Sequence, residues 1–290
     1  MGRAVSRPPR SLIVFTHARP EQTSDALRRV IEMARVVGVE VRLAPDEVKK
    51  HGIEPQEGVT LDANPEADTD LAVVLGGDGT ILRTLRLFAG RRVTVFAVNF
   101  GTIGFLATVE PAELEEGMRM ALAGELDGLE LPGLMATTAD GEVLAMNDIS
   151  FHRRDTGRVA ELAYSVEGEE LGEVRCDGLV VATPAGSTGY NLANGGPVLA
   201  WGVEGYVVSF IAPHTLTARA LVVAPGDVLS VTNRSREEDL EMTTDGRAVC
   251  LLAREDTMDI RFKRGCALLA QLPGASFYHR LREKFGRLAY

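Results

Sequence analysis

The fold of this chain is decided by the stretch LAVVLGGDGT at residues 71–80. Its first five residues form a continuous apolar run, which is typical of a strand buried on both faces of a parallel sheet. The glycines after residue 75 end that strand, and a helix is expected from about Thr80 to Phe88. A buried strand that leads through a glycine loop into a helix is the repeating unit of an open α/β sheet.

The signals on both sides of this stretch repeat the same alternation. Apolar runs predict strands at residues 12–15, 39–43 and 93–98. Helical spacing of apolar residues predicts helices at about 20–37 and 111–123, and Gly38 and Gly124 stand where glycines commonly end helices. Residues 44–70 predict no single element. We therefore expect an N-terminal α/β domain over residues 11–124, with an open, Rossmann-like parallel sheet.

The pattern changes after Gly124. Helical spacing fades, and short strand signals separated by turns follow at residues 142–146, 161–166, 179–182, 207–211, 228–232 and 257–262. Such a series predicts a mainly antiparallel β domain, here over residues 125–270. A helix over 277–287 is expected to return to the first domain, within a C-terminal segment of residues 271–290. Residues 1–10 carry basic side chains without an apolar run and are expected to be a disordered tail.

Composition and charge argue against several classes of protein. The chain of 290 residues has a formal net charge of −10, whereas nucleic-acid-binding surfaces are usually basic, so no nucleic-acid partner is expected. The longest apolar runs are strand-sized, so no membrane span is expected either. The three cysteines, Cys176, Cys250 and Cys266, form no Cys-x-x-Cys pair, which argues against a zinc site or a disulfide framework and favours a reducing cytoplasm.

Two familiar nucleotide-binding motifs are absent from the sequence. None of its four lysines follows a glycine, so the chain has no Walker-type phosphate loop. No Gly-x-Gly-x-x-Gly follows a strand signal, which weakens the case for a standard Rossmann dehydrogenase. If this acidic chain binds polyphosphate ligands, it must use main-chain N–H groups, a few arginines and a divalent metal ion.

Asp78 gives the first glycine loop its chemical interest. In open α/β sheets, ligands collect at the carboxyl ends of the strands, where glycine lets the main chain approach a phosphate and the next helix offers its first N–H groups. A carboxylate in that position repels phosphate, so it makes more sense as a general base or a metal partner beside an incoming hydroxyl. The alternative is a plain strand-to-helix turn in which Asp78 helps to cap the helix.

Two further segments carry a similar signal. The loop NFGTIG at residues 99–104 follows the next predicted strand, and two glycine loops at adjacent strand ends would form the floor of a cleft. A turn that only needs glycine conformations is the alternative for this loop. The segment 175–192 combines a strand with a loop of small residues, in which Thr188, Tyr190 and Asn191 supply hydrogen-bonding groups for a nucleotide. Taken alone, this segment also fits a structural turn.

Together these residues resemble the NAD kinase family, whose members phosphorylate the 2′-hydroxyl of the adenosine ribose of NAD to give NADP. The resemblance runs from about Leu12 to the C-terminus. Its motifs occur in the family's order: GGDGT at 76–80, NFGTIGFL at 99–106, Asn147-Asp148, DGLVVATPAGSTGYN at 177–191, Gly195-Gly196-Pro197 and PHTLTARALV at 213–222. The GGDG loop is shared with lipid kinases of the diacylglycerol and sphingoid type, whereas the long motif that begins at Asp177 is highly specific.

The resemblance implies roles for individual residues. Asp78 falls on the family's catalytic aspartate, Gly79 on a nucleotide contact, and Arg83 is placed to face phosphate. The family's Asn-Glu pair, which holds the adenine and ribose side of NAD, falls on Asn147 and Asp148. The other positions that match binding residues of the family are Arg158, Arg175, Asp177, Thr188, Gly189, Tyr190, Asn191, Leu192, Ala193 and Arg247. Three of the matched positions depart from the family's pattern: Asp148 stands in place of Glu, Gly189 stands where the family often has Ala, and Arg247 stands in place of Gln.

The activity implied is that of an NAD kinase. The terminal phosphate of ATP, or of polyphosphate, passes in line to the ribose hydroxyl while Asp78 takes its proton. No dense cluster of carboxylates marks a protein-only metal site, so Mg²⁺ is expected to arrive with the phosphate donor. The family habit and the strand edges of the β domain imply a homodimer or homotetramer. A lipid kinase and a dinucleotide-binding regulator without turnover are the alternatives. The sequence leaves open the donor, the use of NADH, feedback by NADP and the oligomeric state.

Overall fold

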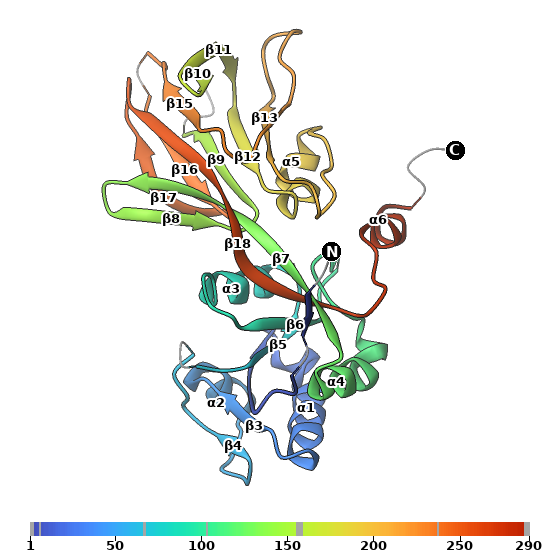
Figure 1. The fold of residues 1–290 in the computed structure, drawn as a ribbon. Coiled ribbons are helices and arrows are strands. Elements are labelled where there is room, and N and C mark those ends of the chain that lie inside the picture. Colours follow the sequence, from blue (N-terminus) through green and yellow to red (C-terminus); the bar gives the residue numbers. More distant parts are fainter. Residues whose placement is uncertain are drawn as a thin grey trace. The chain divides into compact units, whose positions relative to one another are not determined.

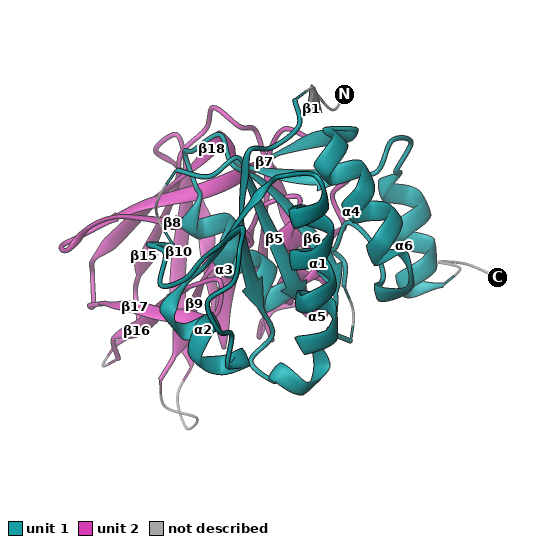
Figure 2. Cartoon of the chain, turned by 90° about the horizontal axis from the view of Figure 1, so that it is seen from below, with its two compact units in different colours: residues 1–130, 267–290 teal, residues 131–266 magenta. Residues whose placement is uncertain are grey.

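The structure is a computed structural model that describes residues 3–5, 7–65, 68–102, 104–154, 159–236 and 238–286 (Figure 1). The chain divides into two compact units (Figure 2). The first unit comprises Met1–Glu130 and Ala267–Tyr290, and the second comprises Leu131–Cys266. Among the described residues, no helix combines the length and the apolar character that a membrane span needs.

The first unit contains the predicted parallel sheet. Its strands are β2 (Ser11–Thr16), β3 (Glu40–Leu43), β4 (Val59–Thr60), β5 (Leu71–Gly76) and β6 (Thr94–Asn99). They are parallel and lie in the order β6-β5-β2-β3-β4. β2, β5 and β6 are buried over their whole length, which explains why each contains an uninterrupted apolar run.

Helices occur in the first unit where the apolar spacing predicts them. They are α1 (Ser24–Val36), α2 (Pro45–His51), α3 (Asp78–Leu87), α4 (Leu114–Ala123) and α6 (Phe277–Phe285). Of these, only α2 lies where the sequence predicts no single element. Both predicted terminal glycines, Gly38 and Gly124, have a left-handed φ of 72°. They follow α1 and α4, so these two helix ends are confirmed.

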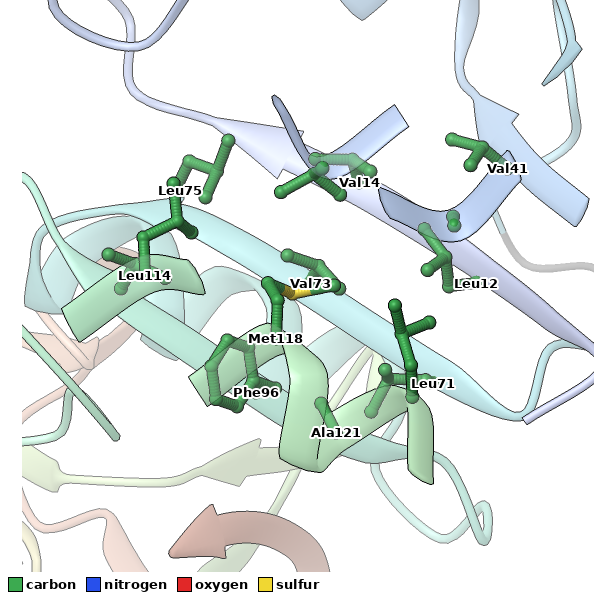
Figure 3. Close-up of a cluster of buried hydrophobic side chains, with 14 of the residues drawn as sticks. Leu12, Val14, Val41, Leu71, Val73, Leu75, Phe96, Leu114, Met118 and Ala121 are labelled. Carbon is green, nitrogen blue, oxygen red and sulfur yellow. The ribbon is translucent and has the colours of Figure 1, made fainter. Parts of the chain in front are cut away.

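A hydrophobic core joins the sheet to helices α1 and α4. Figure 3 shows Met118 of α4 beside Val73 of β5 and Phe96 of β6. Gly117 allows this approach, because a Cβ there would lie 2.9 Å from Cζ of Phe96 and 3.1 Å from Cγ1 of Val109. Burial of such side chains is the main favourable contribution to folding, at about 25 cal/mol per Å² of apolar surface.

The second unit is built of antiparallel strands. One sheet has the order β14-β13-β12-β9-β16-β17. Its strands are β9 (Asp148–Arg153), β12 (Gly178–Ala182), β13 (Tyr206–Ile211), β14 (Leu221–Val223), β16 (Leu240–Thr244) and β17 (Arg247–Leu252). A short helix, α5 (Tyr190–Ala193), comes between β12 and β13.

A second group of strands completes this unit. β10 (Ala160–Val166) lies between β11 (Glu169–Cys176) and β15 (Leu229–Asn233), and β15 pairs with the first residues of β18 (Thr257–Gln271). Strands of both groups contribute to one hydrophobic core, for example Phe151 of β9 and Leu162 of β10. The mainly antiparallel architecture predicted for this half of the chain is confirmed.

β7 (Leu126–Thr138) and β18 are the two longest strands described. β7 forms a hairpin with β8 (Gly141–Ala145), and its first residues pair with β1 (Arg3–Val5), which lies in the segment expected to be a tail. The end of β18 belongs to the first unit, where Leu268 and Leu269 pair in parallel with Thr94 and Val95 of β6. Thus the last strand of the β-rich half also extends the parallel sheet.

Candidate active site

The loop after β5 makes a tight turn into α3. Gly77 is extended, with φ −91° and ψ −178°, and α3 begins at Asp78. A Cβ at Gly76 would lie 2.8 Å from the Cβ of Thr80, so a larger residue there would require the turn to open. The first N–H groups of α3 therefore lie at the carboxyl end of β5, the edge of the sheet where the sequence predicts a phosphate site.

The two glycine loops lie side by side, as predicted. The N–H of Phe100 donates to the carbonyl oxygen of Gly76 at 3.0 Å. A Cβ at Gly77 would lie 3.1 Å from the Cα of Gly101, so the two main chains are in contact. Packing alone therefore requires glycine in both loops, whether the second loop is a cleft floor or a turn.

The Asp78 carboxylate is bonded to a neighbouring loop. Its Oδ2 accepts a hydrogen bond from the main-chain N–H of Phe105 (3.1 Å), and its Oδ1 accepts one from the N–H of Leu106 (3.0 Å). The residue at the N-cap of α3 is Gly77, so Asp78 does not occupy the capping position. Asp78 is half-buried, and each carboxylate oxygen keeps a lone pair for a further partner. The geometry favours a carboxylate held for chemistry over the capping alternative.

Asn99 holds the second glycine loop. Its Oδ1 accepts the N–H of Gly101 at 3.0 Å, and its Nδ2 donates to both oxygens of Glu110, at 3.0 and 3.2 Å. Lys284 of α6 donates to the same Glu110 at 2.5 Å. The buried Asn99 side chain is thus used within the protein, and it fixes the loop beside Asp78.

Gly79 and Arg83 lie one turn apart on α3, and both are exposed. Residues four apart share a face of a helix, so the arginine stands on the same face as the exposed glycine. In the described part of the structure, nothing lies within 4 Å of a Cβ built at Gly79. This face of α3 is open to a ligand, and the roles of both residues stay predictions.

In the second unit, one aspartate fixes the main chain of the predicted Asn147-Asp148 pair. The carboxylate of Asp245 accepts hydrogen bonds from the N–H groups of Met146 (3.1 Å), Asn147 (2.6 Å) and Asp148 (3.2 Å). Asp245 and Gly246 form the turn between β16 and β17, with positive φ values of 46° and 73°. An Asp-Gly pair suits such a two-residue hairpin turn, and here the turn also carries the clamping carboxylate.

Polar side-chain atoms of Asn147 and Asp148 are buried without the full set of partners that would offset their loss of water. Asp148 is only 7% exposed. Burial raises the pKa of its carboxyl group to about 7, and the negative charge of Asp245 adds to the shift. Oδ1 of Asn147 is buried and has no hydrogen-bond partner among the described residues. An unpaired buried acceptor next to an acid of raised pKa is a feature of binding sites for polar ligands.

The loop after β12 packs directly on this pair. Thr183 donates from Oγ1 to the carbonyl oxygen of Met146 (2.8 Å) and accepts the N–H of Gly186 (3.0 Å). A Cβ at Gly186 would lie 2.1 Å from the carbonyl oxygen of Asn147, so only glycine fits there. Half-buried Thr188 donates from Oγ1 to the carbonyl of Ala185 at 3.1 Å. The structure therefore brings the small-residue loop and the Asn-Asp pair together, and their role in binding a nucleotide stays a prediction.

The predicted residues 189–193 differ in accessibility. Gly189, Tyr190 and Ala193 are exposed, and Leu192 is half-buried. Asn191 is fully buried: its amide donates to the carbonyls of Ser187 (2.9 Å) and Pro197 (3.0 Å), and its Oδ1 accepts from Ser209 (2.6 Å). A ligand contact through this side chain would have to displace one of these bonds.

Tyr190 lies close to several of the other predicted residues. Its ring packs against that of His152, with centroids 5.7 Å apart. Burial is the main reason that the pKa of Tyr190 is raised, and the carboxylates of Asp148 and Asp177 add to the shift. The exposed tyrosine and the two acids thus lie within electrostatic range of one another.

The remaining predicted positions are charged. Asp177 is half-buried and pairs with Arg153 at 2.9 Å, whereas exposed Arg175 forms an ion pair with Glu161 at 3.2 Å. Arg247 is exposed at the start of β17, opposite Thr244 and next to the Asp245 turn. Arg158 lies outside the described residues.

Sequence reasoning missed several supporting residues. Arg153 and Glu110 were not singled out, and neither has a local signal, because each lies far along the chain from its partner, 24 residues from Asp177 and 11 from Asn99. For Asp245 a local signal exists, because an Asp-Gly pair predicts a hairpin turn and so places this carboxylate at the end of two strands. Among the described residues, no group of three or more His, Cys, Asp or Glu side chains is arranged to hold a metal ion.

Two family models match the chain. Residues 22–126 match the ATP-NAD kinase N-terminal domain, and residues 146–268 match the ATP-NAD kinase C-terminal domain. The NAD kinase of Gemmatimonas aurantiaca is 36% identical over 239 residues, which cover 80% of this chain and 81% of that protein. The NAD kinase of Bifidobacterium longum subsp. infantis is 33% identical over 288 residues, which cover 95% of this chain and 82% of that protein.

Solved structures share the fold. The crystal structure of yeast NADH kinase complexed with NADH superposes with a TM-score of 0.86 at 23% identity, covering 98% of this chain and 91% of that one. An NAD kinase from Archaeoglobus fulgidus in complex with ATP gives a TM-score of 0.68 at 24% identity, covering 95% and 96%. The two structures confirm the fold class, and the relatives at higher identity confirm the resemblance carried by the motifs. The chain belongs to the NAD kinase family.

Proposed function

We propose that this protein is an enzyme that transfers the terminal phosphate of ATP to the 2′-hydroxyl of the adenosine ribose of NAD and so makes NADP. The observation that carries the proposal is the setting of Asp78. Its carboxylate stands at the carboxyl end of β5 and at the start of α3, held by the N–H groups of Phe105 and Leu106. In a member of the NAD kinase family, a carboxylate in this setting suits the general base for a ribose hydroxyl.

In the proposed mechanism, Asp78 accepts the proton of the hydroxyl as the hydroxyl oxygen attacks the terminal phosphorus of ATP, and the bond from that phosphorus to the bridging oxygen breaks, so that ADP leaves. The two main-chain hydrogen bonds orient the carboxylate and leave lone pairs for that proton. A positioned base of this kind is worth about 10²–10⁴-fold in rate. The N–H groups of the glycine loop, together with Arg83, suit the negative charge that spreads over the transferred phosphate.

ATP is the proposed donor, taken as its magnesium complex, in which the cation offsets part of the phosphate charge. The Archaeoglobus fulgidus NAD kinase structure holds ATP, and the yeast NADH kinase structure holds NADH. These two complexes support a nucleotide donor and a nicotinamide dinucleotide acceptor for the present protein. The same assay should compare polyphosphate with ATP as the donor and NADH with NAD as the acceptor, and should test NADP as an inhibitor.

For the NAD side we propose the polar groups of the second unit. The unpaired Oδ1 of Asn147 suits an amino group such as that of adenine, and the carboxyl group of Asp148 suits a ribose hydroxyl. The exposed ring of Tyr190 is available for stacking. The further proposed contacts are Arg158, Arg175, Asp177, Thr188, Gly189, Asn191, Leu192, Ala193 and Arg247.

We further propose a cytoplasmic homodimer or homotetramer. The three cysteines are free thiols, which suits a reducing compartment. β14 is an edge strand, and its Val222 is 49% exposed, while nearby in sequence Leu216 is 93% exposed. Exposed apolar side chains beside an open strand edge suit a surface that binds a second copy.

The test is an assay that contains the purified protein, NAD, ATP and Mg²⁺, with NADP detected by an NADP-specific dehydrogenase. Formation of NADP is expected, and omission of either nucleotide should abolish it. Parallel reactions replace NAD with diacylglycerol or a sphingoid base. Lipid phosphorylation without NADP formation would favour the lipid kinase, and NAD binding without any turnover would favour the regulator.

A further inference from the structure

Three residues of the first unit, Phe105-Leu106-Ala107, connect the Asp78 carboxylate to helix α6; they are named here the clamp segment. The N–H groups of Phe105 and Leu106 donate to Asp78 at 3.1 and 3.0 Å. The carbonyl oxygens of Phe105, at 3.0 Å, and of Ala107 accept hydrogen bonds from Nη1 of Arg280 in α6. The clamp segment is thus held by a carboxylate through its N–H groups and by a guanidinium through its carbonyls.

The peptide group between Phe105 and Leu106 is the direct link. Its N–H donates to Asp78 and its carbonyl accepts from Arg280, so each hydrogen bond polarises the group in the direction that strengthens the other. The clamp segment is buried, with its residues only 3% to 4% exposed, so its carbonyls need partners inside the protein. A guanidinium suits this task because its several N–H donors have a fixed planar geometry.

Helix α6 is fixed on the clamp segment by further contacts. The ring of Phe105 packs against those of Phe277 and Phe285, with centroids 5.8 Å apart in both pairs. Nη2 of Arg280 also donates to Oε1 of Gln271 at 3.3 Å, and Gln271 is itself buried at the end of β18. The guanidinium is therefore held from both of its terminal nitrogens, and its position is defined relative to the clamp segment.

The charges around Arg280 also connect it with Asp78. Burial lowers the pKa of Arg280, and the largest opposing influence is the carboxylate of Asp78, ahead of those of Glu283, Glu110 and Glu113. The carboxylate of Asp78 therefore favours the charged form of Arg280 across the clamp segment.

We propose that Arg280 is a positioning residue for the general base: by holding the carbonyls of the clamp segment, it sets the direction in which the Asp78 carboxylate faces the acceptor hydroxyl. The inference rests on the function proposed above for Asp78. It gives the C-terminal helix a part in turnover that is exerted through the main chain of another loop.

The test uses the full-length enzyme with Arg280→Lys and Arg280→Met. For both variants kcat should fall by about 10–100-fold, because a shift of about 1 Å in a reacting group costs on that order. The KM values for NAD and ATP should change far less than kcat. Arg280→Lys should retain more activity than Arg280→Met, since lysine keeps the charge and its N–H donors.

The matched control is Arg282→Met, two residues further along α6. Arg282 is exposed, and its guanidinium contacts the ring of His279 at 3.3 Å. This variant removes one positive charge from the same helix but leaves the clamp segment intact, so its kcat should equal that of the wild type. An equal loss in Arg282→Met and Arg280→Met would overturn the proposal, because it would reduce the effect to the charge or stability of the helix.

A double variant separates positioning from general damage to the fold. If Arg280 acts through Asp78, adding Arg280→Lys to Asp78→Asn should leave the residual rate of Asp78→Asn unchanged. A variant that only loosens the fold would lower the rate by the same factor in both backgrounds. Rates are compared at a temperature at which thermal unfolding shows every variant to be folded, and Arg280→Lys carries the test if Arg280→Met does not fold.

Besides an equal loss in Arg282→Met and Arg280→Met, two results would overturn the positioning role while the proposed function stands. One is a folded Arg280→Lys variant with the kcat of the wild type, and the other is an equal fractional loss with and without Asp78. Failure of the proposed function itself looks different, because the wild-type enzyme would then form no NADP.

Discussion

Gly77 and Gly101 lie with their main chains in contact, so that a Cβ on Gly101 would lie 2.7 Å from the Cα of Gly77. The two glycines belong to loops at the ends of β5 and β6, which are adjacent parallel strands. Their contact sets the spacing of the two loops at the edge of the sheet where Asp78 stands.

Gly101→Ala is therefore expected to destabilise the protein by about 1–3 kcal/mol, because the added methyl group meets main chain that cannot move aside. Chemical denaturation measures the loss of unfolding free energy. Gly202→Ala is the control, since within the described structure no atom lies within 4 Å of a Cβ built there. Equal stability of the two variants would contradict the packing of the loops.

Asp78→Asn should lower kcat by about 10²–10⁴-fold, the usual worth of a positioned general base. Its affinity for NAD, measured by calorimetry, should stay close to that of the wild type, because the amide keeps the size of the side chain. Asp25→Asn is the control: this aspartate of α1 has a side chain that is 99% exposed and pairs with Arg28. If the Asp78→Asn enzyme turned over at the rate of Asp25→Asn, Asp78 would lose its proposed role.

Asp245→Asn should weaken NAD binding and destabilise the protein by about 1–3 kcal/mol, because an amide NH₂ cannot accept the N–H bonds that one carboxylate oxygen accepts. Asparagine tolerates the left-handed main chain of this turn, so the change tests the carboxylate rather than the turn. Calorimetric titration with NAD and thermal unfolding measure the two effects. The exposed Asp140, in the turn between β7 and β8, supplies the control Asp140→Asn, which should leave both quantities unchanged.

The raised pKa of Asp148, about 7 against an ordinary 3.8, predicts a pH dependence of stability. The folded state binds more protons than the unfolded state between these values, so this contribution favours folding at about pH 4 and is lost as the pH rises through about 7. Asp148→Asn cannot ionise and should remove this dependence, which is on the order of 4 kcal/mol when fully developed.

Denaturant titrations of wild type and Asp148→Asn between pH 5 and pH 8 would measure this effect. The slope of the unfolding free energy against pH gives the difference in bound protons between the folded and unfolded states. The variant should gain stability relative to the wild type as the pH rises. Parallel curves for the two proteins across that range would show that Asp148 does not titrate near neutrality in the folded state.

Much of the architecture follows from local patterns in the sequence. The apolar run of β5 indicates a strand buried on both faces, and the apolar spacing in α1 indicates a helix buried on one face. Both elements occur where predicted. β7 was not predicted, because Pro132 and Gly133 in its middle resemble a break. In the structure Gly133 instead allows close packing, since a Cβ there would lie 2.6 Å from Cδ1 of Leu144. β11 was missed because it is an edge strand rich in exposed charge.

The motifs of the candidate site could be predicted from the sequence, but the residues that hold its side chains by hydrogen bonds could not. Asp78 is separated from its donors Phe105 and Leu106 by 27 and 28 residues, and Asp148 is separated from Asp245 by 97. Local spacing carries no information about pairs so far apart, because they are brought together only by the tertiary fold. The bond between Asn191 and Ser209 crosses 18 residues, whereas its other partners, Ser187 and Pro197, lie only four and six residues away.

The pairing of β18 with β6 has a consequence for synthesis of the chain. β6 pairs with β5 along one edge, and along its other edge Thr94 and Val95 pair with the end of β18, whereas Ala97 and Asn99 bond to residues 108 and 109. The partner of Thr94 and Val95 is therefore made only after the whole of the second unit. Until then a nascent chain carries the start of β6 as an open edge, with main-chain N–H and C=O groups of the kind that recruit other strands. A chain whose synthesis ends within residues 131–266 therefore has a sheet that lacks the last residues of β18, and aggregation should begin at the edge left open.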